Sequence, residues 1–363
     1  MKKNVFRIGG QRIAPGESQD IRLPISETYL GDEAYVPLRV IRAKEAGPAV
    51  FVTAAIHGDE INGTGIIHDF LFGGPVELTK GTLILAPIVN VFGFEAHERY
   101  LPDRRDLNRS FPGSANGSFA SRIAHTLITE IADQCDYGID LHTAAFQRTN
   151  YPNVRADITD PKVRDLANAF GCALVIDGKG PVGSFRRECT KRGCPTIILE
   201  AGEPWKIEPG ILQIGVQGIR NVLISLGMMS GELQRPPYQA LIRKTTWVRA
   251  TVGGILKFHV SPGQFVEEGQ GIATNYSVFG KAQNTLRSKH NGIVIGMLTM
   301  PAVKPGEPVC NIGLIPPRAI RHYQSELNKS KADPYQQVVH NLATNMEIMA
   351  EKELGKFNPL APS

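Results

Sequence analysis

The chain has 363 residues and a net charge of +5 at pH 7, with 42% hydrophobic and 21% charged residues. This composition is ordinary for a soluble globular protein, and the length predicts two domains or one large domain with an appendage. Lysines and arginines are scattered rather than clustered, which argues against a nucleic-acid binder, and no apolar segment is long enough to span a membrane. Five cysteines without a CxxC pair favour reduced thiols in a cytoplasmic protein.

The first part of the chain alternates between strand and helix patterns. Residues 1–47 mix glycine, proline and short apolar alternations, which predicts edge strands. Strands are then expected at 49–56, 81–90, 137–142, 173–176 and 196–199, and helices at 61–72, 119–134, 160–170 and 208–226, with a long polar loop at 95–117. This order predicts an α/β fold over residues 1–235, with a mixed, mostly parallel sheet flanked by helices.

The pattern changes near residue 235. Residues 236–318 are rich in Gly, Val and Ile, and two related turns at 260–266 and 303–309 predict a smaller all-β domain of the sandwich or barrel type. Residues 319–363 are expected to form a helical extension, in which Asp333 and Pro334 open a helix with an apolar stripe. We expect that stripe to pack against the body or a second copy, and therefore a homo-oligomer.

Two histidines and two glutamates stand where predicted strands end. His57 and Glu60 follow the strand at 49–56, His142 ends the strand at 137–142, and Glu200 follows the strand at 196–199. The carboxyl ends of parallel strands meet at one edge of a sheet, where ligands bind. Two histidines and one glutamate are the ligands of a catalytic zinc site that keeps one position open for water, although another divalent ion could use them.

Each of these acids also has a plainer interpretation. Glu60 could be an acid in a first helical turn that interacts with the helix dipole, and its neighbour Asp59 could replace it as the ligand. Glu200 could form an ion pair at a strand end, or act as a general base beside the metal. Gly58 is expected to allow the backbone an unusual angle in this turn.

The loop at 99–113 contains four arginines near two aspartates. They could form a solvated ion-pair network. A guanidinium group, however, grips a carboxylate with two hydrogen bonds, which lysine does not reproduce. Asn108 adds a neutral donor beside Arg109, and this pair suits the carboxylate of an amino acid.

Four motifs together resemble the succinylglutamate desuccinylase/aspartoacylase family, a branch of the zinc carboxypeptidase-like fold. They are HGDE at 57–60, DLNR at 106–109, DLH at 140–142 and Glu200. The resemblance covers residues 45–230, and the β region after 235 is similar to the family's C-terminal domain. It implies one zinc ion per chain bound by His57, Glu60 and His142, with Glu200 as the base that activates water.

The resemblance also implies that Asn108 and Arg109 bind a substrate carboxylate and that an arginine polarises the scissile carbonyl group. Arg99 is the first choice for that arginine, with Arg104 and Arg105 as alternatives because the spacing departs from the family pattern. The implied activity is a zinc-dependent amidohydrolase that deacylates small N-acyl amino acids. A zinc carboxypeptidase acting on short peptides and a non-catalytic, ligand-binding oligomeric module are the alternatives.

The β region also resembles biotinyl and lipoyl folds through its two related turns. Lys281 lies between them without the flanking methionines of a modified lysine. A lid or wall beside the zinc site is therefore the favoured role of this region.

Overall fold

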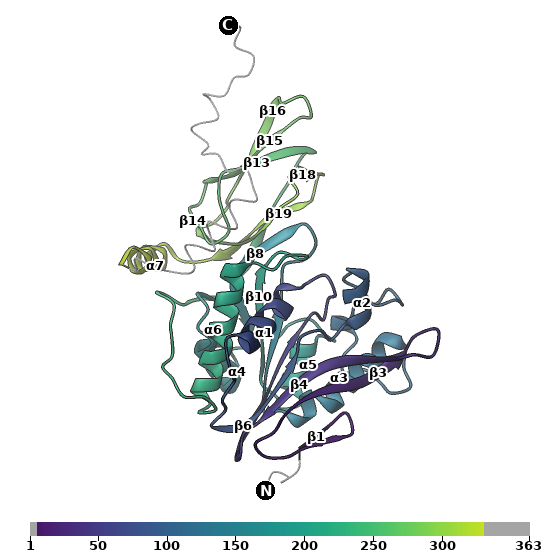
Figure 1. Cartoon of the computed structure of the whole chain (residues 1–363). Helices are drawn as coiled ribbons and strands as arrows, with labels where there is room; N and C mark the ends of the chain where they lie inside the picture. Colours follow the sequence, from purple (N-terminus) through teal and green to yellow (C-terminus); the bar gives the residue numbers. More distant parts are fainter. Residues whose placement is uncertain (1–5, 330–363) are drawn as a thin grey trace.

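The computed structural model describes residues 6–329, which form a large mixed sheet flanked by helices, with a second, smaller sheet toward the C-terminus (Figure 1). The strands are β1 (Phe6–Ile8), β2 (Gln11–Ile13), β3 (Ser18–Glu27), β4 (Glu33–Arg42), β5 (Glu45–Ala54), β6 (Lys80–Ala86), β7 (Tyr137–His142), β8 (Arg148–Ala156), β9 (Leu174–Asp177), β10 (Thr196–Gly202), β11 (Ala240–Ile242), β12 (Thr245–Arg249), β13 (Gly254–Phe258), β14 (Phe265–Val266), β15 (Gly271–Tyr276), β16 (Ala282–Arg287), β17 (Gly292–Leu298), β18 (Ala302–Val303) and β19 (Pro308–Leu314). The helices are α1 (Asn62–Phe72), α2 (Val91–Ala96), α3 (Phe119–Glu130), α4 (Pro161–Phe170), α5 (Phe185–Lys191), α6 (Pro209–Ser225) and α7 (Pro317–Lys329), with short 3₁₀ helices η1 (Leu107–Arg109) and η2 (Ala132–Gln134).

The centre of the large sheet is parallel, as the sequence predicts. Strand β5 pairs in parallel with β6 on one side and β7 on the other, and β7 pairs in parallel with β10. Val50, Phe51 and Val52 of β5 are fully buried, because helices cover both faces of this part of the sheet. The spatial order of the main path is β12-β19-β17-β8-β10-β7-β5-β6-β4-β3, and the strands toward both ends are antiparallel.

Helices α1, α4 and α6 pack on one face of this sheet, and α3 and α5 pack on the other (Figure 1). The stripe predicted for α3 is confirmed, since Ile123, Leu127 and Ile128 are buried. Asp160 caps α4 by accepting hydrogen bonds from the backbone nitrogens of residues 162 and 163, and Gly171 ends the helix with a left-handed φ of 80°.

Strand β8, helices α2 and α5 and the 3₁₀ helix η1 were not predicted. Strand β8 follows the turn after β7, and α5 precedes β10, yet the sequence of neither has a clear apolar period. The helix expected at 119–134 is also divided, since α3 ends at Glu130 and η2 follows.

Strand β8 connects the parallel centre to the C-terminal region. It pairs antiparallel with β10 on one side and with β17 on the other, so β17, β19 and β12 extend the large sheet. The small sheet, in the order β16-β15-β13-β18, packs against this extension through a separate apolar core that includes Phe258, Ile272 and Met297. Both predicted turns, at 260–266 and 303–309, join strands.

Helix α7 packs against the body of the protein through Ile320 and Tyr323, whose ring stacks on Tyr238. The helix expected from Asp333 onward lies outside the described residues. All five cysteines are buried thiols. Within residues 6–329, no helix has both the length and the apolar character needed to cross a membrane.

Candidate active site

The turn between β5 and α1 carries His57 and Glu60. Ala55 starts the turn with a left-handed φ of 53°, and the backbone nitrogen of Glu60 donates to the carbonyl oxygen of His57. The reason expected for Gly58 was wrong, because its φ is not in the left-handed region. A Cβ at Gly58 would instead lie 1.9 Å from the carbonyl carbon of Gly93, so glycine is required by the close approach of α2.

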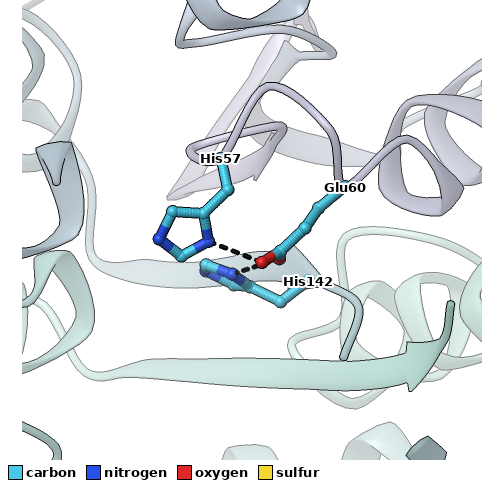
Figure 2. Close-up of side chains that lie close together, drawn as sticks. All are labelled: His57, Glu60 and His142. Carbon is cyan, nitrogen blue, oxygen red and sulfur yellow. Dashed lines mark hydrogen bonds and ion pairs between the residues drawn. The ribbon is translucent and has the colours of Figure 1, made fainter. Parts of the chain in front are cut away.

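The side chains of His57, Glu60 and His142 converge and are almost fully buried (Figure 2). Nδ1 of His57 lies 2.7 Å from Oε1 of Glu60, and Nδ1 of His142 lies 2.9 Å from Oε2. Each of the three residues offers one ligand atom, and these atoms lie within 4.8 Å of one another. Asp59 is not in this group, so the geometry favours Glu60 over its neighbour as a ligand.

Both imidazole rings are oriented from behind by a carboxylate. Nε2 of His142 lies 2.8 Å from Asp140, which also accepts a hydrogen bond from the hydroxyl group of Thr53, and Nε2 of His57 lies 3.2 Å from Asp106. A neutral ring that donates from Nε2 has a lone pair on Nδ1. In that tautomer, the lone pairs of both Nδ1 atoms point at the lone pairs of the Glu60 carboxylate. These lone pairs repel each other unless a proton or a metal cation lies between the nitrogen and the oxygen.

The pKa shifts of these residues also show that the site favours positive charge. Burial alone would lower the pKa of His57 and of His142. The carboxylates of Glu60 and Asp106 nevertheless raise the pKa of His57. Those of Asp140 and Glu60 raise the pKa of His142 well above its ordinary value. Burial alone would raise the pKa of Glu60, but the two histidines lower it. The donor set and its electrostatics therefore fit a divalent cation.

Arg99 borders this group. Its guanidinium group donates to Glu60 at 3.0 Å and to Asp106 at 3.1 Å, and these carboxylates raise its pKa although burial opposes the shift. Arg99 also lines the pocket. Neither Arg104 nor Arg105 is among the residues that line it, and Arg105 is largely exposed, with its guanidinium group bonded to Ser118.

Asn108 and Arg109 lie in η1 and line the same pocket. The side-chain oxygen of Asn108 accepts the backbone N–H of Phe185, at the start of α5, which fixes the carboxamide. One guanidinium nitrogen of Arg109 donates to the backbone oxygen of Asn108.

Glu200 lies in β10 and lines the pocket together with the histidines. It is the register partner of His142 in β7. Its Oε2 accepts a hydrogen bond of 3.0 Å from Nδ2 of Asn150, and its Oε1 lies 3.6 Å from Arg155. Glu200 is therefore held between two side chains of β8.

The pocket is a cavity of about 410 Å³ with a strongly cationic wall. Besides Arg99 and Arg109, three further arginines line it, and their buried Nε atoms have no hydrogen-bond acceptor among the described residues: Arg148, Arg155 and Arg186. Burial and the neighbouring Arg155 lower the pKa of Arg186 to about 10. Trp247 and Asn311 add a wall from the C-terminal region. The guanidinium carbon of Arg148 lies 5.7 Å from the centre of the Trp247 ring.

The sequence alone did not mark the three further arginines, Trp247 or Asn311 as residues of the site. Arg148, Asn150 and Arg155 belong to β8 and Arg186 to α5, the two elements that lacked a period. The pair Arg186-Arg187 gave no distinct signal, because Glu188, Lys191 and Arg192 follow it in the same charged segment.

Comparison with known proteins identifies relatives. A curated relative, the N-alpha-acetyl-L-2,4-diaminobutyric acid deacetylase of Halomonas elongata, is 27% identical over 308 residues, which are 80% of this chain and 90% of the relative. The crystal structure of a succinylglutamate desuccinylase/aspartoacylase from Rhodobacter sphaeroides matches with a TM-score of 0.71 and 27% identity, over 82% of this chain and 94% of that one.

The product-bound structure of the ectoine utilization protein EutE (DoeB) from Ruegeria pomeroyi shares the fold, with a TM-score of 0.73 and 24% identity over 82% of this chain and 95% of that one. Residues 46–226 match the family model of the succinylglutamate desuccinylase/aspartoacylase catalytic domain, and they contain the four motifs with His57, Glu60, His142 and Glu200. The chain belongs to the succinylglutamate desuccinylase/aspartoacylase family.

Proposed function

We propose that the protein is a zinc-dependent amidohydrolase that removes the acyl group from a small N-acyl amino acid. The observation that carries this proposal is the placement of Glu200 in the same pocket as the convergent group of His57, Glu60 and His142. The relative from Halomonas elongata, a deacetylase of an N-acetylated amino acid, supports it. The buried thiols suit a reducing compartment and favour a cytoplasmic location.

His57, Glu60 and His142 would hold the zinc ion, which when bound polarises the amide carbonyl group and lowers the pKa of water. Glu200 accepts the proton of the attacking water and then delivers it to the departing amine. Asp140 and Asp106 keep the imidazole rings in the tautomer that leaves Nδ1 available to the metal.

Arg99, Asn108 and Arg109 act on the substrate rather than on the water. Arg109 and the amide nitrogen of Asn108 grip the carboxylate of the amino acid, because the oxygen of Asn108 is already occupied by residue 185. Arg99 is anchored to Glu60 and Asp106 and lines the pocket, so its charge stabilises the oxyanion that develops at the carbonyl oxygen.

The charge of the cavity favours a substrate with a second anionic group. One carboxylate needs one guanidinium group, yet Arg148 and Arg186 line the same cavity as Arg109, and so does Arg155, which lies 3.6 Å from Glu200. Three acids among the described residues line the pocket: Glu60, Asp177 and Glu200. Only Asp177 is assigned neither metal binding nor proton transfer, so little negative charge is left to balance the arginines. A dicarboxylic substrate therefore suits this cavity better than one with a second amino group, such as that named for the Halomonas elongata relative.

The test is the release of free amine from a matched panel of substrates by the zinc-loaded protein. N-acetylaspartate, N-acetylglutamate and N-succinylglutamate are compared with N-alpha-acetyl-2,4-diaminobutyrate, before and after removal of the metal with a chelator. We expect metal-dependent hydrolysis, and a higher kcat/KM for the compounds with two or three carboxylates than for the diaminobutyrate derivative. Equal or higher kcat/KM for the diaminobutyrate derivative would overturn the charge argument, and metal-independent hydrolysis would overturn the zinc mechanism.

A zinc carboxypeptidase is the second candidate, since the Asn108–Arg109 pair would also suit the C-terminus of a peptide. The walls contributed by Trp247 and Asn311 restrict the cavity and favour small substrates. Dipeptides and tripeptides belong in the same panel, and activity on them without activity on N-acyl amino acids would favour the carboxypeptidase. Bound zinc without hydrolysis of any compound would favour a non-catalytic binding protein.

A further inference from the structure

Strand β8 holds the side chain of Glu200 from one side of the pocket. Nδ2 of Asn150 donates to Oε2 of Glu200 at 3.0 Å, and Asn153 donates to the backbone oxygen of Glu200 at 3.1 Å. An ionised carboxylate only accepts hydrogen bonds, so the carboxamide of Asn150 must present its nitrogen to Glu200 and turn its oxygen away.

That oxygen lies over Gly296 of β17. Gly296 is the register partner of Asn150, and in an antiparallel pair the side chains of opposite residues lie on the same face. A Cβ at Gly296 would lie 2.3 Å from Oδ1 of Asn150 and 3.0 Å from the backbone oxygen of Thr149. A methyl group there would displace the Asn150 carboxamide, the end of a rotatable side chain, rather than the strand.

We propose that Asn150 is a positioning residue for Glu200 and that Gly296 makes this possible by leaving room for its carboxamide. The C-terminal region thereby sets the orientation of the proton-accepting carboxylate through one side chain. This inference rests on the proposed role of Glu200 as the base.

The first experiment compares Asn150→Ala and Asn150→Asp with the wild type. Ionised Asp has the shape of Asn but offers no donor to Glu200. Both variants, assayed at a pH where the two carboxylates are ionised, should therefore lower kcat by about 10- to 100-fold, with KM and zinc content within about 2-fold of wild type. Unchanged kcat in both variants would overturn the proposal. A wild-type kcat in Asn150→Asp, with a lowered kcat in Asn150→Ala, would show that the shape of the side chain matters and the hydrogen bond does not. That result would also overturn the proposal.

The second experiment uses Gly296→Ala, with Gly253→Ala as the matched control. A Cβ at Gly253 would have only ordinary contacts, the nearest at 3.5 Å. We expect Gly296→Ala to lower kcat as Asn150→Ala does and Gly253→Ala to leave it unchanged. In the double variant Asn150→Ala/Gly296→Ala the two losses should not add, because the second change acts only through the carboxamide that the first removes. Fully additive losses would contradict the coupling.

A readout without turnover separates this inference from the proposed function. Crystal structures of the zinc-loaded wild type and of Gly296→Ala should show the bond between Nδ2 of Asn150 and Oε2 of Glu200 in the first and not in the second. If the wild type hydrolyses no substrate, or if Glu200→Gln retains full activity, the proposed function fails while these structures still decide the contact. An intact bond in Gly296→Ala would overturn the role of Gly296.

Discussion

His142 and Glu200 are register partners on the adjacent parallel strands β7 and β10. Partners in neighbouring strands lie about 4.8 Å apart, and their side chains project from the same face of the sheet. The pairing therefore places a candidate base beside a candidate metal ligand, although the two residues are far apart in sequence. His142, one of the candidate metal ligands, is thus tied to Glu200 through the backbone pairing of β7 with β10.

The first prediction concerns Glu200→Gln. The variant keeps the size of the side chain and its position in β10 but does not accept a proton, so we expect kcat to fall by about 10²- to 10⁴-fold with normal zinc content. Steady-state kinetics and metal analysis of the same preparation measure both quantities. Near-normal turnover would remove Glu200 from the mechanism.

The parallel centre of the fold and the placement of the metal group could be predicted because both depend on local sequence. Apolar runs of strand length followed by His57, His142 or Glu200 lie near the carboxyl ends of β5, β7 and β10, although β10 continues past Glu200 to Gly202. The geometry of parallel sheets brings such ends to one edge. Capping residues such as Asp160 likewise determine where α4 begins. At these strand ends and at this helix cap, the pattern of the local sequence agrees with the tertiary structure.

Strand β8 could not be predicted, because its sequence mixes buried asparagine and proline with arginine. Two of its polar side chains, those of Asn150 and Asn153, donate to Glu200, a long-range partner that no local pattern reveals. The requirement for Gly58 is similar, since its contact with Gly93 arises only when α2 packs against the turn. Both contacts form only when the chain folds, so the local sequence does not reveal the roles of Asn150 and Gly58.

The second prediction concerns Asp140→Asn. Asp140 is fully buried and its charge stabilises the Nε2–H tautomer of His142, so loss of that charge should weaken zinc binding by about 10- to 100-fold. Competition with a chromophoric chelator measures the affinity. Asp177→Asn is the control, because Asp177 lines the same pocket but contacts neither histidine in the described structure. An equal loss in both variants would contradict a specific role for Asp140.

The third prediction concerns Arg109→Lys. Lysine keeps the charge but loses the planar pair of donors, and a hydrogen bond to a charged group contributes about 1.5–3 kcal/mol, so KM should rise by about 10- to 100-fold with little change in kcat. Arg105→Lys, at an exposed position outside the pocket, should leave KM unchanged. A fall in kcat without a change in KM would assign Arg109 to the chemical step instead.

The fourth prediction concerns the pH dependence of stability in the metal-free protein. Folding raises the pKa of His57 and of His142, so their contribution to stability is complete below the unfolded pKa of about 6.5 and is lost as the pH rises through the folded values. The melting temperature of chelator-treated protein should therefore fall as the pH is raised above about 6.5. Zinc binds the deprotonated rings, so the stabilisation that zinc adds should increase over the same range. A flat profile in the metal-free protein would contradict the raised pKa values.

The fifth prediction concerns Gly58→Ala. The added methyl group would lie 1.9 Å from one backbone atom of Gly93 and 2.2 Å from the backbone nitrogen of Phe94, and neither atom moves without α2. We expect a loss of about 1–3 kcal/mol in the free energy of unfolding by urea, and weaker zinc binding because His57 moves with the turn. Gly253→Ala, where the added methyl group would have only ordinary contacts, should change stability by less than about 0.5 kcal/mol. Equal stability of the two variants would show that the turn between β5 and α1 tolerates a side chain at residue 58. It would also show that the approach of α2 does not fix the position of His57, a candidate metal ligand.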